Sequence, residues 1–257
     1  MKLAKGFSLL VGALILLSGV TRTAMAQEGT LEPEAIFFSH VYYDFGTGLL
    51  SNPRGGPQVN LPGDVYNNTN PAAPANFGFS STDLGAQFGD RVSTIGAGVL
   101  QENDFTIFNS GTSAGPLLSA TFKIELLNAA SNALLGGYST LPISFGPSGL
   151  APGYYSIVTV LGLGGLNITV NTTDVLMRQS VVSKTGTANK LGIASLDPPS
   201  IGSSTATMYI NTPTIGPAGY YNIGVPPQNA NPGYRININA PVSVQSKSWG
   251  SVKALYH

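Results

Sequence analysis

The most concentrated group of residues that could do chemistry is the acidic pair Glu102 and Asp104, in the segment Gln101-Glu102-Asn103-Asp104. Residues two apart in a β-strand project from the same face, so these two carboxylates could together supply oxygen atoms to a hard cation. Calcium is therefore the candidate ligand. The alternative is a solvated acidic loop, which is favoured because Ca²⁺ takes about six to eight oxygen ligands and the pair offers few.

Hydrolytic catalysis finds few candidates in this chain. A glycosidase needs two carboxyl groups that face each other across the scissile bond. The acidic residues are scattered, and Glu102, Asp104 and Glu125 are the first to suspect because they lie in or near the best-defined strands. No Gly-x-Ser-x-Gly, phosphate-binding loop or dinucleotide-binding motif occurs. We therefore predict no catalytic residues and a protein that is not an enzyme.

Histidine is equally sparse, since the chain has only His40 and the final residue His257. His-rich metal sites are excluded, and a Ser-His-Asp triad would have one internal base to use. His40 falls between Ser39 and Val41 in an expected strand. We interpret it as a packed or edge imidazole.

The elements that must position these residues are β-strands. Leu118, Ala120, Phe122, Ile124 and Leu126 alternate with polar residues, which is the pattern of a half-buried strand. The same period of two appears at 166–170 and 234–238, and further strands are expected at 36–43, 104–108, 154–160, 175–182 and 205–210. Clusters of Gly, Pro, Asn and Ser lie between them, and no long amphipathic helix follows the first segment. The sequence predicts an all-β, antiparallel, jelly-roll-like β-sandwich.

Three turns lead into aromatic residues, at Pro152-Gly153-Tyr154-Tyr155, at 217–221 and at Pro232-Gly233-Tyr234. Proline fixes φ and glycine accepts positive φ, which suits a tight turn before a strand. The tyrosines are expected to pack at the edge of the sandwich. The alternative is an exposed tyrosine platform for sugars.

The N-terminus has the layout of a secretory signal peptide. Lys2 and Lys5 precede an apolar run, and Ala24-Met25-Ala26 forms an Ala-x-Ala cleavage site. We expect cleavage after Ala26, with Gln27 as the first mature residue. The run is shorter than the roughly 20 residues of a membrane-spanning helix, so stable membrane insertion is not expected.

Charge excludes one class of partner. The chain has 12 basic and 12 acidic residues, and the signal contains three of the basic ones, Lys2, Lys5 and Arg22. The mature chain therefore has an excess of three acidic residues and no basic patch suited to nucleic acid. Charged residues make up only 9% of the chain and cysteine is absent, a composition typical of extracellular bacterial β-proteins. Without disulfides, stability must come from the size of the core.

The domain organisation follows from these signals. Residues 1–26 form the signal peptide, 27–247 one β-sandwich domain, and 248–257 a C-terminal tail. Residues 50–83, rich in Asn, Gly and Pro, are expected to form a long surface loop.

A family resemblance rests on four short motifs: Tyr43-Asp44-Phe45, Gly89-Asp90-Arg91-Val92, the strand Ala120–Leu127 and the turn Pro152-Gly153-Tyr154-Tyr155. With an export signal, these motifs resemble the secreted β-sandwich domains of bacterial proteins that carry PEP-CTERM or related choice-of-anchor tails. The resemblance implies a surface or matrix component and no catalytic residues. The Val-Pro-Glu-Pro motif of such tails does not occur here, so the resemblance does not extend to that sorting route.

The tail contains the only tryptophan, Trp249, followed by Gly250, Lys253 and Tyr256. Such an aromatic and basic segment is similar to short sorting motifs of secreted bacterial proteins. The other interpretation is a last strand or turn whose tryptophan caps the core, and it is slightly favoured.

Together these features predict a non-enzymatic, secreted or cell-surface protein with a structural or interaction role in a matrix, an appendage or adhesion. Its partners would be other extracellular proteins or glycans. The alternative function is a carbohydrate-binding module or a weak glycan-active enzyme, because sandwiches often carry aromatic sugar-binding faces and structural calcium.

Overall fold

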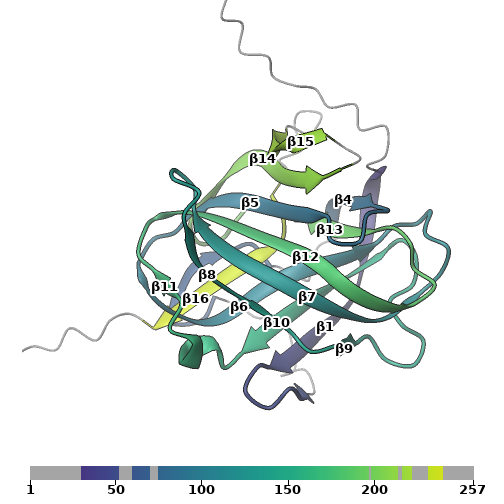
Figure 1. Ribbon diagram of the computed structural model, residues 1–257, viewed down its shortest axis with the longest axis horizontal. Coiled ribbons are helices and arrows are strands. Elements are labelled where there is room, and N and C mark those ends of the chain that lie inside the picture. The colour runs from purple at the N-terminus through teal and green to yellow at the C-terminus, as the bar shows by residue number, and fades with distance from the viewer. Residues whose placement is uncertain are drawn as a thin grey trace, which may run out of the picture.

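The structure is a computed structural model, and it describes residues 30–51, 60–69, 75–196, 198–213, 216–221 and 231–239. Within these ranges the chain forms two packed β-sheets, one short 3-10 helix, η1 (Leu163–Leu166), and no α-helix (Figure 1). The predicted all-β sandwich is therefore confirmed.

Sheet A, the larger sheet, consists of β1 (Thr30–Asp44), β2 (Leu50–Ser51), β3 (Asp64–Asn67), β4 (Ala75–Ser81), β6 (Gly98–Asn109), β10 (Tyr154–Leu161), β11 (Thr169–Val170), β13 (Leu191–Ser195) and β16 (Tyr234–Asn239). Sheet B consists of β5 (Gln87–Ser93), β7 (Leu117–Asn128), β8 (Leu134–Ser139), β9 (Ile143–Ser144), β12 (Asp174–Gly186), β14 (Ser203–Thr212) and β15 (Gly216–Tyr221).

The expected signal peptide, with Ala24, Ala26 and Gln27, and the expected tail at 248–257 lie outside the described residues. In the part of the chain that is described, no helix has the length and apolar character that a bilayer crossing requires.

Part of sheet A closes on itself. Its main strands run in the order β10-β1-β4-β13-β6-β16-β3, and β10 also pairs with β6, which joins β10, β1, β4, β13 and β6 in a ring. Strand β1 makes this closure: its first part pairs antiparallel with β4, and its second part, from Ile36 on, pairs in parallel with β10, with a register shift between Phe37 and Ser39. Such a bulge bends a strand, which allows β1 to follow two neighbours.

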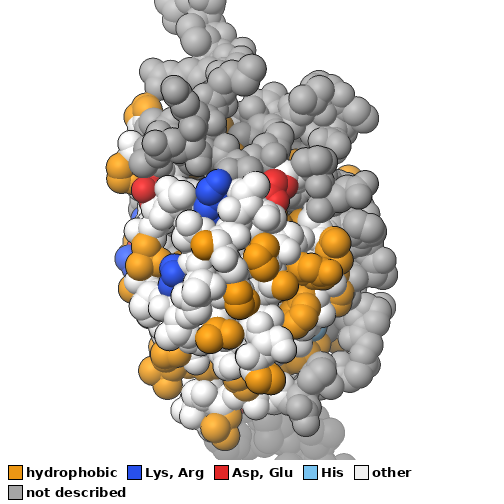
Figure 2. Space-filling model, turned by 90° about the vertical axis from the view of Figure 1, so that its right-hand side faces the viewer, with side chains coloured by type: hydrophobic (Ala, Val, Ile, Leu, Met, Phe, Trp, Pro, Cys, Tyr) orange, Lys and Arg blue, Asp and Glu red, His pale blue; other side chains and the backbone are white. Residues whose placement is uncertain are grey.

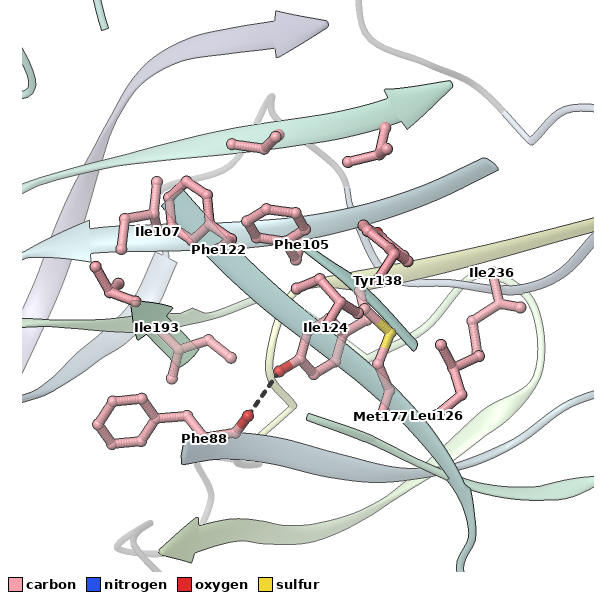
Figure 3. Packing of buried hydrophobic residues seen from close by; sticks show 14 of the residues in the cluster. Phe88, Phe105, Ile107, Phe122, Ile124, Leu126, Tyr138, Met177, Ile193 and Ile236 are labelled. Carbon is pink, nitrogen blue, oxygen red and sulfur yellow. Dashed lines mark hydrogen bonds between the residues drawn. The ribbon is translucent and has the colours of Figure 1, made fainter. Parts of the chain in front are cut away.

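The main core lies between the two sheets (Figure 3). The ring of Phe105 in β6 meets that of Phe122 in β7, with centroids 4.9 Å apart. Phe79 of β4 and Phe88 of β5 meet edge to face at 5.8 Å. Aromatic pairs of this geometry add to the stabilisation that burial of their area provides, so these contacts hold the sheets together.

A second, smaller cluster consists of residues from the ring in sheet A. Its members are Ala35, Phe37, Phe108, Tyr155, Ile157, Ala194 and Leu196. Gly78 in β4 completes it, because a Cβ atom there would come within 2.3 Å of the Phe108 ring. Sheet A is therefore covered with apolar side chains on both faces around Phe108, so its strands are buried on both faces there.

The predicted register of β7 is correct in its centre and wrong at its start. Ala120, Phe122, Ile124 and Leu126 are buried, whereas Leu118 is 38% exposed. The pairing of β7 with β12 shifts register between Thr185 and Gly186, so Leu117 instead of Leu118 faces the core. A bulge turns the following side chains to the other face, which a strict period of two cannot predict.

Two other expectations are corrected. The predicted loop at 50–83 contains β3, whose residues are all buried, and β4, which pairs with both β1 and β13. Strand β3 was missed because Asp64 and Asn67 are polar yet buried, which hides the apolar alternation. The predicted strand at 166–170 is reduced to Thr169–Val170, since Leu166 ends η1. The remaining predicted strands fall within β1, β6, β10, β12, β14 and β16.

Candidate functional site

Three carboxylates meet around one buried guanidinium. Arg235 Nε donates to Asp64 Oδ1 at 2.7 Å, Nη1 to Asp104 Oδ1 at 3.3 Å and Nη2 to Glu102 Oε2 at 3.0 Å. The side chains of Arg235, Asp64 and Asp104 are 0% exposed, and that of Glu102 is 24% exposed. We call these four residues the Arg235 cluster.

Strand pairing positions the cluster. Strand β16 lies between β6 and β3, with Arg235 opposite Asp104 on one side and Asn237 opposite Asp64 on the other. Glu102 and Asp104 are two residues apart in β6 and share a face, as their spacing predicted. Asn237 Nδ2 also donates to Asp64 Oδ1 at 2.8 Å, so this carboxylate has two protein donors on one oxygen.

The network continues from Asp104 toward β1. Thr69 Oγ1 donates to Asp104 Oδ2 at 3.1 Å, and Thr159 also hydrogen-bonds this carboxylate. The Thr159 hydroxyl is 2.7 Å from His40 Nε2, and the His40 ring stacks on Tyr42 with centroids 4.4 Å apart. A chain of polar groups therefore links β1, β10, β6, β16 and β3.

Burial sets the protonation of this network. Burial raises the pKa of Asp104, and the charge of Arg235 and the hydroxyl donors offset this only in part. Burial, together with the positive charge of Arg235, lowers the pKa of His40 to about 4. His40 is consequently a neutral imidazole at pH 7, which agrees with the packed histidine expected from the sequence.

The favoured interpretation of Glu102 and Asp104 as a solvated loop is wrong, because both residues lie in strand β6 and Asp104 is buried, and a cation of the protein itself stands where calcium was the alternative. The oxygens of Glu102 and Asp104 bind the guanidinium of Arg235, a cation that belongs to the protein itself. Within the described ranges, no group of three or more His, Asp or Glu side chains is arranged to hold a metal ion. Both carboxylates of the pair therefore make internal ionic contacts with Arg235, whose single positive charge offsets part of the negative charge of the cluster.

Glu125 lies away from this cluster, on sheet B. Its carboxylate pairs with Arg178 Nε at 2.9 Å and with Lys123 Nζ at 3.0 Å. Burial opposes ionisation of Glu125, but these two donors outweigh it and lower its pKa. The three carboxylates suspected from the sequence are therefore divided between two sheets and do not form one site.

A further buried carboxyl, Asp90, points into the main core from β5. Ser204 Oγ donates to Asp90 Oδ2 at 2.6 Å. Asp90 Oδ1 and the hydroxyl of Tyr66 interact electrostatically, although neither has a well-formed hydrogen bond. Burial raises the pKa of Asp90 well above its usual range, so the folded protein favours the protonated, neutral form of this acid.

A shallow pocket opens between the β4–β5 turn and strands β12 and β13, with about 390 Å³ of empty space that includes open solvent. Its lining includes Ser81, Asp83, Phe88, Gln179, Lys184 and Leu191. Gln179 Nε2 donates to the Thr106 carbonyl at 2.6 Å, while its buried Oε1 has no hydrogen-bond partner among the described residues. An ordered water would satisfy such an oxygen. No member of the Arg235 cluster lines this pocket.

Sequence reasoning identified Glu102 and Asp104 but not Asp64, Asp90 or Arg235. Alternation in 234–238 correctly places Tyr234, Ile236 and Ile238 in the core, and it assigns Arg235 to the opposite, solvent side. The structure buries that side as well. An arginine within a strand that otherwise contains only uncharged residues, in a chain with few charges, was the available signal, because a buried charge requires partners.

The tail residues Trp249, Gly250, Lys253 and Tyr256 lie outside the described residues. Compared with models of known protein families, with curated proteins and with solved structures, the chain gave no match.

Proposed function

We propose that this protein is a non-enzymatic component of the cell exterior, secreted or held at the cell surface, which acts by presenting its surface to other extracellular molecules. The observation that carries the proposal is the engagement of Glu102 and Asp104 by Arg235. General acid–base catalysis needs ionisable groups that can reach a substrate. Here the side chains of Asp104 and Arg235 are completely buried, and the carboxylates of Asp104 and Glu102 both form ion pairs with Arg235.

The surface supports an interaction role. Ile36 and Phe38 of β1 are 52% and 42% exposed, and the Phe38 ring meets Tyr154 of β10 edge to face at 6.2 Å. Figure 2 shows a face on which hydrophobic side chains are numerous and charged ones are few. Exposed apolar side chains that gather on one face are a feature of contact surfaces.

The extracellular address rests on the first 26 residues. Lys2, Lys5, the apolar run and the Ala24-Met25-Ala26 site have the layout that export machinery recognises. The resemblance to bacterial proteins with choice-of-anchor tails points to the same compartment. The segment from Trp249 to Tyr256 is our candidate for a sorting signal.

Export and surface presentation can be tested together in a bacterial host that expresses the full chain. Mass spectrometry of extracellular material should give Gln27 as the first residue, and protease added to intact cells should remove any cell-bound protein. A chain that keeps Met1–Ala26 and remains protected inside the cell would contradict the proposal. A variant with Ala24 and Ala26 replaced by Leu is the matched control, because it should block cleavage.

A further inference from the structure

One transverse row of residues crosses the whole of sheet B. Strand pairing places in register Tyr220 of β15, Tyr209 of β14, Gly89 of β5, Arg178 of β12, Glu125 of β7 and Gly137 of β8. Their sequence neighbours Phe88, Met177 and Ile124 belong to the main core, so the row lies on the face directed away from it. Neighbouring strands are about 4.8 Å apart, which makes a row across six strands roughly 24 Å long.

The row begins with two aromatic rings. Tyr220 is 40% exposed, and its ring meets that of Tyr209 at 5.7 Å with an interplanar angle of 72°. The guanidinium of Arg178 lies 6.0 Å from the centroid of the Tyr209 ring, and Nη1 is 3.5 Å from the Tyr209 hydroxyl. Tyr209 is thereby held from both sides, and Tyr220 presents an aromatic surface to solvent.

Gly89 allows Arg178 to make this contact. It lies directly between Tyr209 and Arg178 in the row, and a Cβ atom there would come within 2.5 Å of the Met177 carbonyl oxygen and 2.9 Å of the Arg178 Cβ. Because β5 has no side chain at this point, Arg178 can extend across it toward Tyr209.

Planar polar side chains lie at the other end of the row and beside it, since Gln87 and Asn211 pair with each other two positions along β5 and β14. Glu125 Oε2 accepts from Arg178 Nε at 2.9 Å and from Gln87 Nε2 at 3.3 Å. Asn211 Nδ2 donates to Gln87 Oε1 at 2.8 Å. These contacts fix the orientation of a guanidinium, a carboxylate and two amides. Among the described residues, the contacts of Arg178 use Nε and Nη1, which leaves donors on Nη2 for a ligand.

This arrangement matches the chemistry of a neutral glycan. An aromatic ring packs on the apolar C–H face of a sugar, while orientated planar groups give paired hydrogen bonds to neighbouring hydroxyls. Glu125 pairs with both Arg178 and Lys123, so two positive charges and one negative charge leave a net charge of only +1 among the three, and the face offers little to a phosphate backbone. We propose that a neutral oligosaccharide or polysaccharide stacks on the exposed ring of Tyr220 and reaches the guanidinium of Arg178, whose side chain is 20% exposed, while the buried Tyr209 and Glu125 hold these two groups in place. This inference rests on the proposed extracellular role, for which it names the class of partner.

The test uses the exported full-length protein with three soluble neutral polysaccharides, a β-glucan, a xylan and a mannan, in affinity electrophoresis and calorimetric titration. We expect at least one to bind, Tyr220→Ala and Arg178→Ala to weaken binding tenfold or more, and Tyr220→Phe to bind like the wild type because the ring remains. Lys190→Ala is the matched control, since this cation hydrogen-bonds the Thr112 hydroxyl, away from the row.

Two results would overturn the inference: absence of binding to all three polysaccharides, or Tyr220→Ala binding as tightly as the wild type. Binding to immobilised peptides in their place would also overturn it. If Arg178→Ala fails to fold, the exposed Tyr220 decides the matter alone. A protein that is exported and accessible on cells but binds no glycan would refute this face while leaving the proposed function intact. A protein retained in the cytoplasm would refute the proposed function itself.

Discussion

Arg235 donates from Nε to Asp64 Oδ1 across 2.7 Å, and neither side chain has any solvent exposure. This contact joins the last described strand, β16, to the edge strand β3, while Nη1 and Nη2 of the same guanidinium join β16 to β6. Burial favours the neutral form of Arg235, but the charges of Asp104 and Asp64 outweigh it and raise the pKa further. The cluster is therefore held together by one cation that cannot lose its proton.

Removing that cation should destabilise the protein strongly. Arg235→Met leaves three carboxylates without a counter-charge, two of them fully buried, and we expect the free energy of unfolding to fall by about 3–5 kcal/mol. Urea denaturation, followed by the circular dichroism of the backbone, measures this free energy. Arg235→Lys is the matched control and should lose less, because it keeps the charge but not the three-way fork. Equal losses for both variants would show that charge compensation is not the cause.

Replacing Asp90 should raise the free energy of unfolding, whereas replacing Arg235 should lower it. Burial raises the pKa of Asp90 in the folded protein, so above the ordinary pKa of an aspartate the folded state retains a proton that the unfolded state has lost. Stability then decreases as the pH rises through this window. Asp90→Asn removes this titration while preserving the shape. We expect the variant to be more stable than the wild type at pH 8 and to lose less stability between pH 5 and pH 8. Parallel pH profiles for the two proteins would refute this.

His40 should make the protein sensitive to acid. Its pKa is lowered from 6.5 to about 4 by burial and by Arg235, so between these values the unfolded state binds the extra proton. Stability is then fully present above pH 6.5 and falls toward pH 4, by about 1–3 kcal/mol for a half-buried group. His40→Gln, which can still reach Thr159, should show a smaller loss over the same range. Thermal unfolding of both proteins at pH 7 and pH 4.5 measures the difference.

The two faces of β7 should respond differently to truncation. Phe122 is fully buried against Phe105 and Phe145, so Phe122→Ala should cost about 3–5 kcal/mol through lost burial and a cavity. Lys123→Ala removes one partly exposed ion pair with Glu125 and should cost less than about 1 kcal/mol. A larger effect at Lys123 than at Phe122 would place the wrong face of β7 in the core.

Phe122 and Arg235 show which buried residues can be predicted from the sequence and which cannot. Phe122 and Ile124 could be assigned to the core because a strand with one solvated face alternates, and β7 has such a face. Arg235 could not be assigned, because both faces of β16 are buried, and in such a strand the alternation of polar and apolar residues does not separate buried positions from exposed ones. Leu118 was misplaced because a bulge depends on the pairing of β7 with β12, which local sequence does not record.

The candidate site was likewise predictable only in part. The spacing of Glu102 and Asp104 was enough to predict that their carboxylates share a side of β6. Their partner was not predictable from spacing, since Arg235 is 131 positions from Asp104 in the chain and meets it only through the β6–β16 pairing. The acidic pair alone therefore suggested a solvated loop or, as the less favoured alternative, a calcium site, whereas the structure supplies a guanidinium. The aromatic and polar row on sheet B likewise exists only in the register of six strands.

We propose that the acidic residues of this protein stabilise its fold, and that the protein acts by binding other molecules at its surface and does not hydrolyse them. Its most direct test is product formation by the purified, exported protein on a broad panel of polysaccharides and esters, measured for the wild type beside Glu102→Gln and Glu125→Gln. We predict no product above background from any of the three proteins. Wild-type turnover that disappears in either variant, while its unfolding transition stays cooperative, would contradict the account.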